Sequence, residues 1–299
     1  MIRLEDTSGS AVAAAIAAER HRMGSSATGM VLTLLILSDE ESQADATAAA
    51  VGAARQHPMR VVTLIPRPGK QETRLDADIS VGGDDGPGEV AVLRLRGLLA
   101  EHANSVAVPL LLSDTPVVAY WPHSSPDVPA DDPIGRHAQR RITDAATCDD
   151  VVRELQARKV GYRPGDTDLS WTRLTPWRSV LASALDQPPG RILRATIAAE
   201  DSNPSAILLG LWLGHNLRVP VESTTSDGPG ITEVRLETDQ GDITVSRTDG
   251  TNAVLSRPGT PESRVALARR DLAALLSEEL RRLDPDEVYG EVIALVAGS

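Results

Sequence analysis

Aromatic side chains are scarce in this sequence. Its 299 residues include no Phe, three Tyr and four Trp, which together make up 2% of the chain. A buried core must therefore come mostly from Ala, Val, Leu and Ile. The hydrophobic content of 41% and the charged content of 24% are ordinary for a globular protein, and the length is enough for two domains.

Cysteine is almost absent as well. Cys148 stands alone, so the chain can form neither an intramolecular disulfide nor a zinc site built on several cysteines. The longest apolar runs, at 31–37 and 206–214, are far shorter than the roughly 20 residues that a membrane-spanning helix needs. Because a lone thiol suits a reducing compartment, we expect a cytoplasmic protein with no membrane association.

Positive charge is in deficit. The chain has 42 acidic and 30 basic residues, which gives a formal net charge of −12. A field of this sign repels polyanions, so we expect no nucleic acid partner and no binding to an anionic membrane surface. A local basic pocket is still compatible with this balance.

The motifs that usually carry chemistry are missing. The sequence has no Gly-x-Gly-x-x-Gly after a predicted strand, no Gly-x-x-x-x-Gly-Lys-Ser/Thr loop and no Gly-x-Ser-x-Gly elbow. Its six histidines are scattered, without the i, i+4 pair and carboxylate companion of a zinc-binding helix. Nothing in the sequence pairs Asp114, Asp144 or Asp168 with a nucleophile. We therefore expect no catalytic residue, no metal, no cofactor and no enzyme activity.

The first half of the chain alternates helix and strand patterns. Continuous apolar runs predict strands that are covered on both faces, and Ala-rich or amphipathic stretches predict helices. This order indicates the α/β class, with a layered, mostly parallel sheet and flanking helices. The predicted strands are 29–37, 60–66, 89–97, 106–112, 117–121 and 140–146, and the predicted helices are 8–22, 41–57, 98–104 and 148–159.

The second half is typical of an α+β domain. The stretch 160–168 resembles a linker and divides the chain into an N-terminal domain, 1–160, and a C-terminal domain, 161–299. Three alternating segments within 231–259 are joined by Gln-Gly and Asp-Gly turns, so they predict an antiparallel three-stranded meander.

The rest of the predicted C-terminal domain is mostly helical. Residues 169–185 form a helix pattern with Pro176 inside it, and 191–198 is a predicted strand. The segment 205–218 is apolar nearly all round, so it should form a buried helix. Thr260-Pro261 and Asp284-Pro285 each place a capping residue before a proline, which predicts the starts of two terminal helices.

Two pairs of arginines are the best candidates for an anion site. Arg94 and Arg96 are two apart on a predicted strand and project from one face. Arg140 and Arg141 begin another predicted strand. Guanidinium groups that converge at the end of a parallel strand can hold a phosphate or carboxylate. The alternative is a set of internal ion pairs, for instance with Asp144 or Asp114.

The scarce aromatic residues gather in two places. Tyr120 and Trp121 end the apolar run of "SDTPVVAYWP", and Trp171 and Trp177 flank a helix pattern that contains Pro176. Trp, Tyr and Arg are the residues most enriched at interface hot spots. We expect these side chains to be exposed and to bind a partner protein. The alternative is that they pack the seam between the two halves. The predicted partner-binding residues are Tyr120, Trp121, Trp171, Arg173, Trp177 and Arg178.

At these residues the sequence resembles a known family. The segments "HPMRVVTLIP" (57–66), "GEVAVLRLRGLLAEHANSVAVPLLLSDTPVVAYWP" (88–122), "QRRITDA" (139–145) and "DLSWTRLTPWR" (168–178) are similar to OpcA, the glucose-6-phosphate dehydrogenase assembly protein of actinobacteria and cyanobacteria. They appear in the family's order and span most of residues 29–220. The combination of "SDTPVVAYWP" with "SWTRLTPWR" is the most specific part of the resemblance.

The resemblance implies a non-catalytic partner of glucose-6-phosphate dehydrogenase in the oxidative pentose phosphate pathway. Such a protein promotes the active oligomeric state of the dehydrogenase and acts as its allosteric activator. Cyanobacterial relatives are associated with cysteine switching, which Cys148 alone cannot perform as an intramolecular disulfide. The competing hypothesis is a phosphosugar-binding α/β enzyme or sensor that uses Arg94, Arg96, Arg140 and Arg141 as anion holders.

Overall fold

The computed structural model describes residues 1–23, 29–82, 88–186, 190–247 and 249–298. Their chain divides into two compact units that interleave along the sequence. The first unit comprises Met1–Thr147, Gly161–Thr167 and Asp271–Asp286, and the second comprises Cys148–Val160, Asp168–Arg270 and Glu287–Ser299. The division into domains 1–160 and 161–299 stays a prediction.

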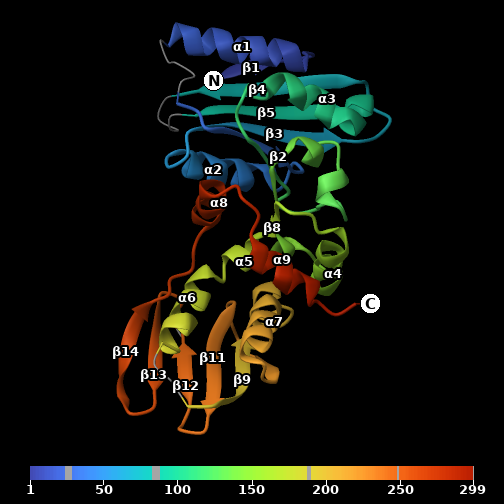
Figure 1. The fold of residues 1–299 in the computed structure, drawn as a ribbon. Helices are drawn as coiled ribbons and strands as arrows, with labels where there is room; N and C mark the ends of the chain where they lie inside the picture. The colour runs from blue at the N-terminus through green and yellow to red at the C-terminus, as the bar shows by residue number, and fades with distance from the viewer. Residues whose placement is uncertain (24–28, 83–87, 187–189, 248, 299) are drawn as a thin grey trace. The chain divides into compact units, whose positions relative to one another are not determined.

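The first unit is built on an eight-stranded sheet. Its strands are β1 (Ile2–Leu4), β2 (Leu32–Leu37), β3 (Met59–Arg67), β4 (Arg74–Val81), β5 (Glu89–Arg96), β6 (Val117–Tyr120), β7 (Arg140–Thr143) and β8 (Asp166–Asp168). Their order across the sheet is β1-β4-β5-β3-β2-β6-β7-β8 (Figure 1). Strands β5, β3, β2, β6 and β7 run parallel, whereas β4 and β1 pair antiparallel at one edge. The predicted layered, mostly parallel sheet is confirmed.

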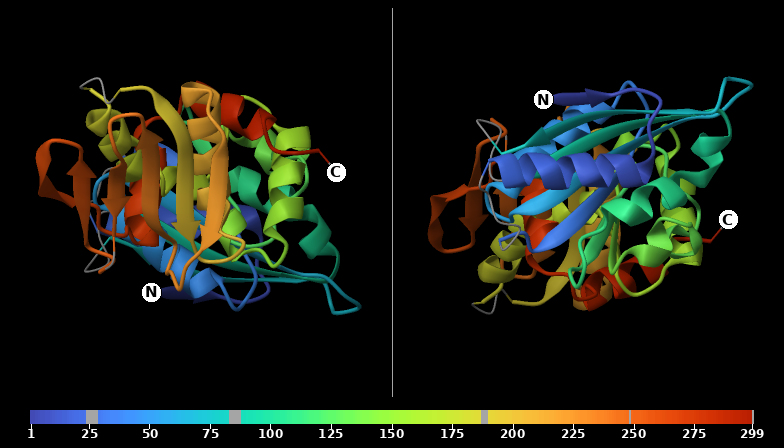
Figure 2. Two further views of the ribbon diagram at one scale, coloured as in Figure 1. Left: turned by 90° about the horizontal axis from the view of Figure 1, so that it is seen from below. Right: turned by 90° about the horizontal axis from the view of Figure 1, so that it is seen from above.

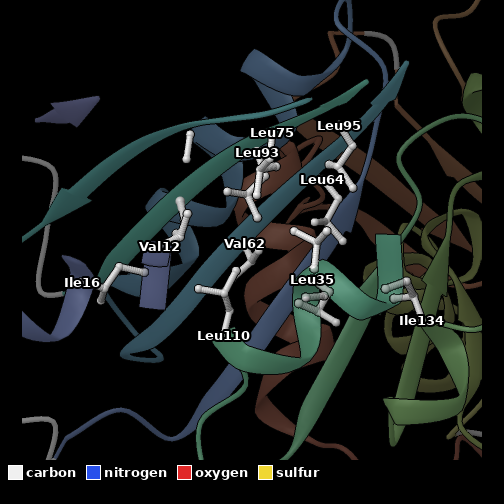
Figure 3. Close-up of a cluster of buried hydrophobic side chains, with 14 of the residues drawn as sticks. Val12, Ile16, Leu35, Val62, Leu64, Leu75, Leu93, Leu95, Leu110 and Ile134 are labelled. Carbon is white, nitrogen blue, oxygen red and sulfur yellow. The ribbon is translucent and has the colours of Figure 1, made fainter. Parts of the chain in front are cut away.

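Helices cover both faces of this sheet. On one face lie α1 (Gly9–Arg22), which begins where the Ser8 hydroxyl accepts the Ala11 N–H, and the short α3 (Ala103–Ala107). Figure 1 shows α2 (Gln43–Ala54) on the opposite side of the sheet from α1, and α8 (Leu272–Arg281) packs against α2. Figure 3 shows the core below α1, where Val12 and Ile16 lie over aliphatic side chains of the strands.

The second unit is built on a six-stranded sheet. Its strands are β9 (Ile192–Ala199), β10 (Val221–Thr225), β11 (Ile231–Thr238), β12 (Ile243–Ser246), β13 (Asn252–Arg257) and β14 (Thr260–Ala266), in the order β10-β9-β11-β12-β13-β14. β10 pairs parallel with β9 and the other neighbours pair antiparallel. β11, β12 and β13 are the predicted meander, to which β14 adds one more strand. The expected α+β character of this part is therefore confirmed.

The remaining helices are α4 (Val151–Gly161), α5 (Leu169–Thr172), α6 (Thr175–Ala184), α7 (Pro204–Leu217) and α9 (Glu287–Ala294). In the second unit α7 packs on β9 and β10, and α6 packs on β12. Figure 2 shows the strands of this sheet side by side, with α7 along them. Leu208, Leu209 and Leu213 of α7 are buried, as the sequence predicted. Asn203 begins α7 by accepting the Ala206 N–H at 2.9 Å, and Pro204 occupies the first turn.

The structure differs from the sequence predictions at several elements. Strands β1, β8 and β10 were not predicted, and β8 lies in the stretch 160–168 that was predicted to be a linker. Residues 106–112 form the end of α3 and a 3₁₀ turn instead of a strand, because short apolar runs fit both structures and Pro109 suits the turn. Strand β4 was missed, although its polar and apolar residues alternate as in a half-buried strand. The segment 260–266 is strand β14 and not the start of a helix: Pro258-Gly259, with Gly259 at φ 72°, turns the chain back from β13. Helix α8 begins only at Leu272, after the cap Asp271.

Candidate functional site

The first unit has the strand arrangement in which ligands often bind beside the sheet. β2 has parallel neighbours on both sides: β3 and β5 follow on one side, and β6 and β7 on the other. The strand order therefore reverses between β2 and β6. Ligands of such sheets bind outside the carboxyl ends of the strands at this point, with phosphate groups at the N-terminus of the first helix. The segment Ser38–Ser42 follows β2 here, and Tyr120 ends β6 with Trp121 directly after it.

The position where such folds hold a phosphate contains a carboxylate of the protein itself. Asp39 accepts hydrogen bonds from the Ser42 hydroxyl at 2.7 Å, the Ser42 N–H at 2.7 Å and the Glu41 N–H at 3.0 Å. The Ser42 hydroxyl, then the N–H groups and the charge of His123, hold the pKa of Asp39 below its usual value. Because Glu40 and Glu41 are adjacent, an incoming phosphate would meet negative charge instead of free donors.

The predicted arginines of β5 belong to a ladder of ion pairs. Arg94 reaches Asp78 on β4 at 2.7 Å and Glu40 at 3.3 Å. Arg96 lies 3.6 Å from Asp76 on the same strand. These contacts follow from the antiparallel register of β4 and β5, which sets the carboxylates of one strand diagonally opposite the guanidinium groups of the other.

The second predicted pair is also bound by carboxylates. Arg140 binds the Glu279 carboxylate of α8 and donates to the Asp284 carbonyl at 2.8 Å. Arg141 binds the Asp166 carboxylate, and it donates to two main-chain carbonyls at 2.7 Å each. The ion pairs that we weighed as the alternative are present, although not with Asp114 or Asp144. An anion at any of these four arginines would have to displace a carboxylate, and their use as anion holders stays a prediction.

The aromatic residues of the first unit are not exposed. Tyr120 is 1% exposed and Trp121 is 2% exposed. Tyr120 ends β6, an inner strand whose four residues are all buried, and Trp121 follows it directly. Trp121 belongs to the same apolar core as Ile134 and Ala138. The expectation that these side chains are exposed was therefore wrong.

The tryptophans of the second unit are buried too. Trp171 is 1% exposed and Trp177 is 2% exposed. The Arg178 guanidinium lies 3.9 Å from the centroid of the Trp171 ring, and Tyr289 of α9 lies 6.1 Å from it. Pro176, in the first turn of α6, separates α5 from α6, so that each helix carries one tryptophan into the interior. Of the predicted partner-binding residues, only Arg173 and Arg178 are partly exposed.

Two family models account for most of the chain. One, described as the glucose-6-phosphate dehydrogenase subunit N-terminal domain, matches residues 50–160, and the other, described as the C-terminal domain of the same subunit, matches residues 164–293. The chain belongs to the OpcA family. The resemblance carried by "SDTPVVAYWP" and "SWTRLTPWR" is thereby confirmed, since both stretches lie inside the matched regions.

Solved structures offer this OpcA chain only remote likenesses. A 3-ketoreductase from Actinomadura kijaniata is 11% identical at a TM-score of 0.48, with 90% of this chain and 95% of that one covered. A dehydrogenase from Clostridium difficile is 7% identical at 0.47, with 88% and 95% covered, and an oxidoreductase from Sinorhizobium meliloti is 10% identical at 0.45, with 88% and 86% covered. Likenesses at this level carry no argument about function. No curated protein matches the chain.

Reasoning from the sequence missed one arginine pair of the OpcA chain. Arg247, which follows β12, and Arg269, which follows β14, are 22 positions apart and approach each other only through the antiparallel sheet. Arg247 is 8% exposed. The only sequence signal is the double arginine Arg269-Arg270, which does not indicate Arg247.

A metal centre is not apparent in the described part of the chain. Among residues 1–23, 29–82, 88–186, 190–247 and 249–298, no three His, Cys, Asp or Glu side chains gather closely enough to hold a metal ion. The Cys148 thiol is half-buried. The same residues include no helix long and apolar enough to cross a membrane.

Proposed function

We propose that this chain is a non-catalytic assembly factor and allosteric activator of glucose-6-phosphate dehydrogenase, acting in the cytoplasm on the oxidative pentose phosphate pathway. The observation that carries the proposal is the pair of family matches, which cover both halves of the chain in order. The net charge of −12 fits a partner that is neither nucleic acid nor an anionic membrane, and the lone Cys148 fits the reducing cytoplasm.

The geometry of the first unit supports a role without catalysis. Its sheet has the strand order that nucleotide-binding enzymes use, yet Asp39 takes the hydrogen bonds that a phosphate would need. The arginines of the neighbouring strand β5 already bind carboxylates. This arrangement favours a role in protein binding over a role in catalysis.

An activator must bind the active state of its partner more tightly than the inactive state. Each tenfold preference shifts the equilibrium of the dehydrogenase by about 1.4 kcal/mol. If the active state of the dehydrogenase is an oligomer, the chain must contact a surface of the dehydrogenase that is formed or ordered only in the oligomer. A shift from mostly inactive to mostly active enzyme therefore requires a strong preference, which several contacts must share.

The residues that make the contact are part of the proposal. Tyr120, Trp121, Trp171 and Trp177 are buried, so they can reach a partner only if the chain rearranges. Arg173 and Arg178 are partly exposed and can contact a partner as the chain stands. We propose that Arg173 takes part in binding, and that the four aromatic residues hold the fold behind it.

The test combines association with activity. The dehydrogenase is mixed with increasing amounts of the chain, and both the size of the complexes and the initial rate with glucose 6-phosphate are measured. We expect co-elution, a larger share of oligomer and a rate that rises to saturation. Arg173→Gln should weaken the association, whereas Arg264→Gln, a change of the same charge on the exposed strand β14, should not.

Two results would contradict the proposal. One is no association and no stimulation over a concentration range well above that of the dehydrogenase. The other is turnover of glucose 6-phosphate by the purified chain alone, which would favour the enzyme hypothesis. An inactive variant of the dehydrogenase serves as the control for contaminating activity.

A further inference from the structure

The second unit contains a buried arginine with an unusual set of partners. Arg247 donates to the main-chain carbonyls of Leu267 at 3.1 Å and Ile231 at 3.0 Å. Its guanidinium lies 5.1 Å from the centroid of the Trp177 ring. These contacts hold the side chain in place, but a carbonyl and an aromatic ring leave its full positive charge uncompensated.

A second guanidinium comes to the same place. A Cβ atom built on Gly230 would lie 3.2 Å from Nη2 of Arg269 and 3.8 Å from Nη2 of Arg247. The Arg269 N–H binds the Gly250 carbonyl at 3.1 Å, which fixes the segment after β14 beside the loop that leads into β13. Two positive charges thus converge at one end of the sheet, on either side of a residue without a side chain.

Neither arginine has a carboxylate partner among the described residues. No ion pair within 4 Å joins Arg247 or Arg269 to an acid in the parts of the chain that the structure covers. The neighbouring Asp249 accepts the N–H groups of Thr251 and Asn252, and Glu200 accepts the side chain of Asn203. Burial, and then the charge of Arg269, lower the pKa of Arg247 to about 10, which is the effect expected of an uncompensated pair.

The lack of a carboxylate partner is unusual in a chain with more acidic than basic residues. The protein has 42 acidic residues against 30 basic ones. It pairs its other described buried arginines with carboxylates: Arg60, Arg140, Arg141 and Arg158. The two like charges repel each other, and the buried guanidinium of Arg247 has also lost much of its hydration, so the folded state is less stable without a counter-charge. An anion bound between the two arginines would offset this cost.

We propose that Arg247 and Arg269 form a binding site for the phosphate group of a small molecule. Two guanidinium charges match a phosphate dianion better than a single carboxylate, and arginine pairs with phosphate through parallel N–H···O bonds. Gly230, at φ 69°, has no side chain, and a Cβ atom there would already lie within 4 Å of both groups, so any side chain at this position would crowd the anion. All of these residues belong to the second unit, so the site is complete within it.

Inorganic phosphate is the probe for the test. The full chain is titrated by calorimetry and by thermal unfolding, with potassium chloride added so that the ionic strength stays constant. We expect saturable binding and a melting temperature that rises with phosphate, since a ligand of the native state stabilises it by RT ln(1 + [L]/Kd). Glycerol phosphate should do the same, which would show that a monoester is accepted.

Arg269→Gln is the decisive variant because Arg269 is exposed and its replacement spares the core. It should weaken phosphate binding at least about tenfold, since a charged hydrogen-bond donor is lost. Arg264→Gln, which removes the same charge from the exposed strand β14, should bind phosphate as the parent chain does. Arg247→Met should abolish binding, and its thermal unfolding shows whether the variant is folded.

Three outcomes would overturn the proposal. The first is no phosphate-dependent stabilisation of the parent chain at tens of millimolar. The second is equal loss of binding in Arg269→Gln and Arg264→Gln, which would indicate general charge attraction. The third is unchanged phosphate binding in Arg269→Gln but weaker association with the dehydrogenase, which would assign the arginine to an acidic side chain of a protein partner. Because phosphate binding is measured on the chain alone, a failed dehydrogenase assay leaves this result standing.

Discussion

The arginines singled out in the two units differ in whether a carboxylate compensates their charge. In the first, Arg94, Arg96, Arg140 and Arg141 lie against carboxylates from neighbouring strands or helices. In the second, Arg247 is buried beside Arg269, with carbonyls and the Trp177 ring as its partners. Two arginines that are close in the sequence therefore do not by themselves indicate an anion-binding site. The useful criterion is whether the fold supplies a counter-charge, and only tertiary structure shows that.

The difference has opposite consequences for stability. Removing one member of a buried ion pair leaves the other charge without a partner, so the protein should lose stability. Removing one of two repelling charges should have the reverse sign.

Trp171→Ala should cost about 3–5 kcal/mol of the free energy of unfolding, because it empties a packed site between Arg178 and Tyr289. Urea unfolding measures this cost. Trp212→Ala, on α7 and only partly buried, is the control and should cost less. Unchanged stability together with lost stimulation of the dehydrogenase would show instead that Trp171 contacts the partner directly.

Arg141→Met should cost about 3 kcal/mol, since the Asp166 carboxylate would keep only the Arg163 N–H as a donor. Arg94→Met, whose ion pairs are partly exposed, should cost about 1 kcal/mol or less. The double variant Arg141→Met/Asp166→Asn should recover part of the loss. If Arg141→Met and Arg94→Met lowered the free energy of unfolding equally, burial would not determine how much an ion pair contributes in the first unit.

Arg269→Gln should raise the free energy of unfolding by about 0.5–1 kcal/mol in phosphate-free buffer of low ionic strength, because it relieves the repulsion on Arg247. The gain should shrink when salt or phosphate is added. Thermal unfolding at several salt concentrations measures it, with Arg264→Gln as the matched control. A loss of stability in Arg269→Gln would mean that the Arg269 guanidinium has a favourable partner. That result would contradict the view that its charge is uncompensated.

Asp39 should give the smallest effect, visible only in acid. Its pKa in the folded state is lowered by the Ser42 hydroxyl and nearby N–H groups, so its contribution to stability is present above the pKa of the unfolded chain. The contribution is lost as the pH falls below about 4 and through the folded pKa. Asp39→Asn should flatten this part of the stability profile by about 1 kcal/mol or less. A profile identical to that of the parent chain would contradict the role of these hydrogen bonds.

Much of the fold followed from local patterns. The strands 32–37 and 59–67 are continuous apolar runs, and such runs require cover on both faces, which a parallel sheet with helices provides. Strand β4 escaped notice because Asp76 and Asp78 sit on the face that carries the arginines of β5, so its charges reflect pairing and not exposure. Strand β14 was mistaken for a helix because Thr260-Pro261 also fits a helix start, and only the hairpin with β13 decides between the two.

The candidate sites followed from the sequence far less well. Pro116 and Pro122 on either side of the apolar run suggested that Tyr120 and Trp121 leave the sheet at an exposed point, yet both side chains are buried. The four predicted arginines are where the sequence suggested, on or at the start of strands, but their counter-charges come from as far away as Glu279. Pairs of this kind depend on how distant segments pack, which no local pattern contains.

The sequence by itself determined the class of the fold, the family and the lack of familiar catalytic motifs, because periodicity, composition and motif are properties of contiguous residues. The tertiary structure alone decided which charges are compensated. Electrostatic energy depends on distance and burial, and folding sets both for residues far apart in the chain. It brought Asp166 to Arg141, whereas among the described residues it brought a second arginine and no carboxylate to Arg247. For that reason the uncompensated charge at the end of the second sheet became visible only in three dimensions.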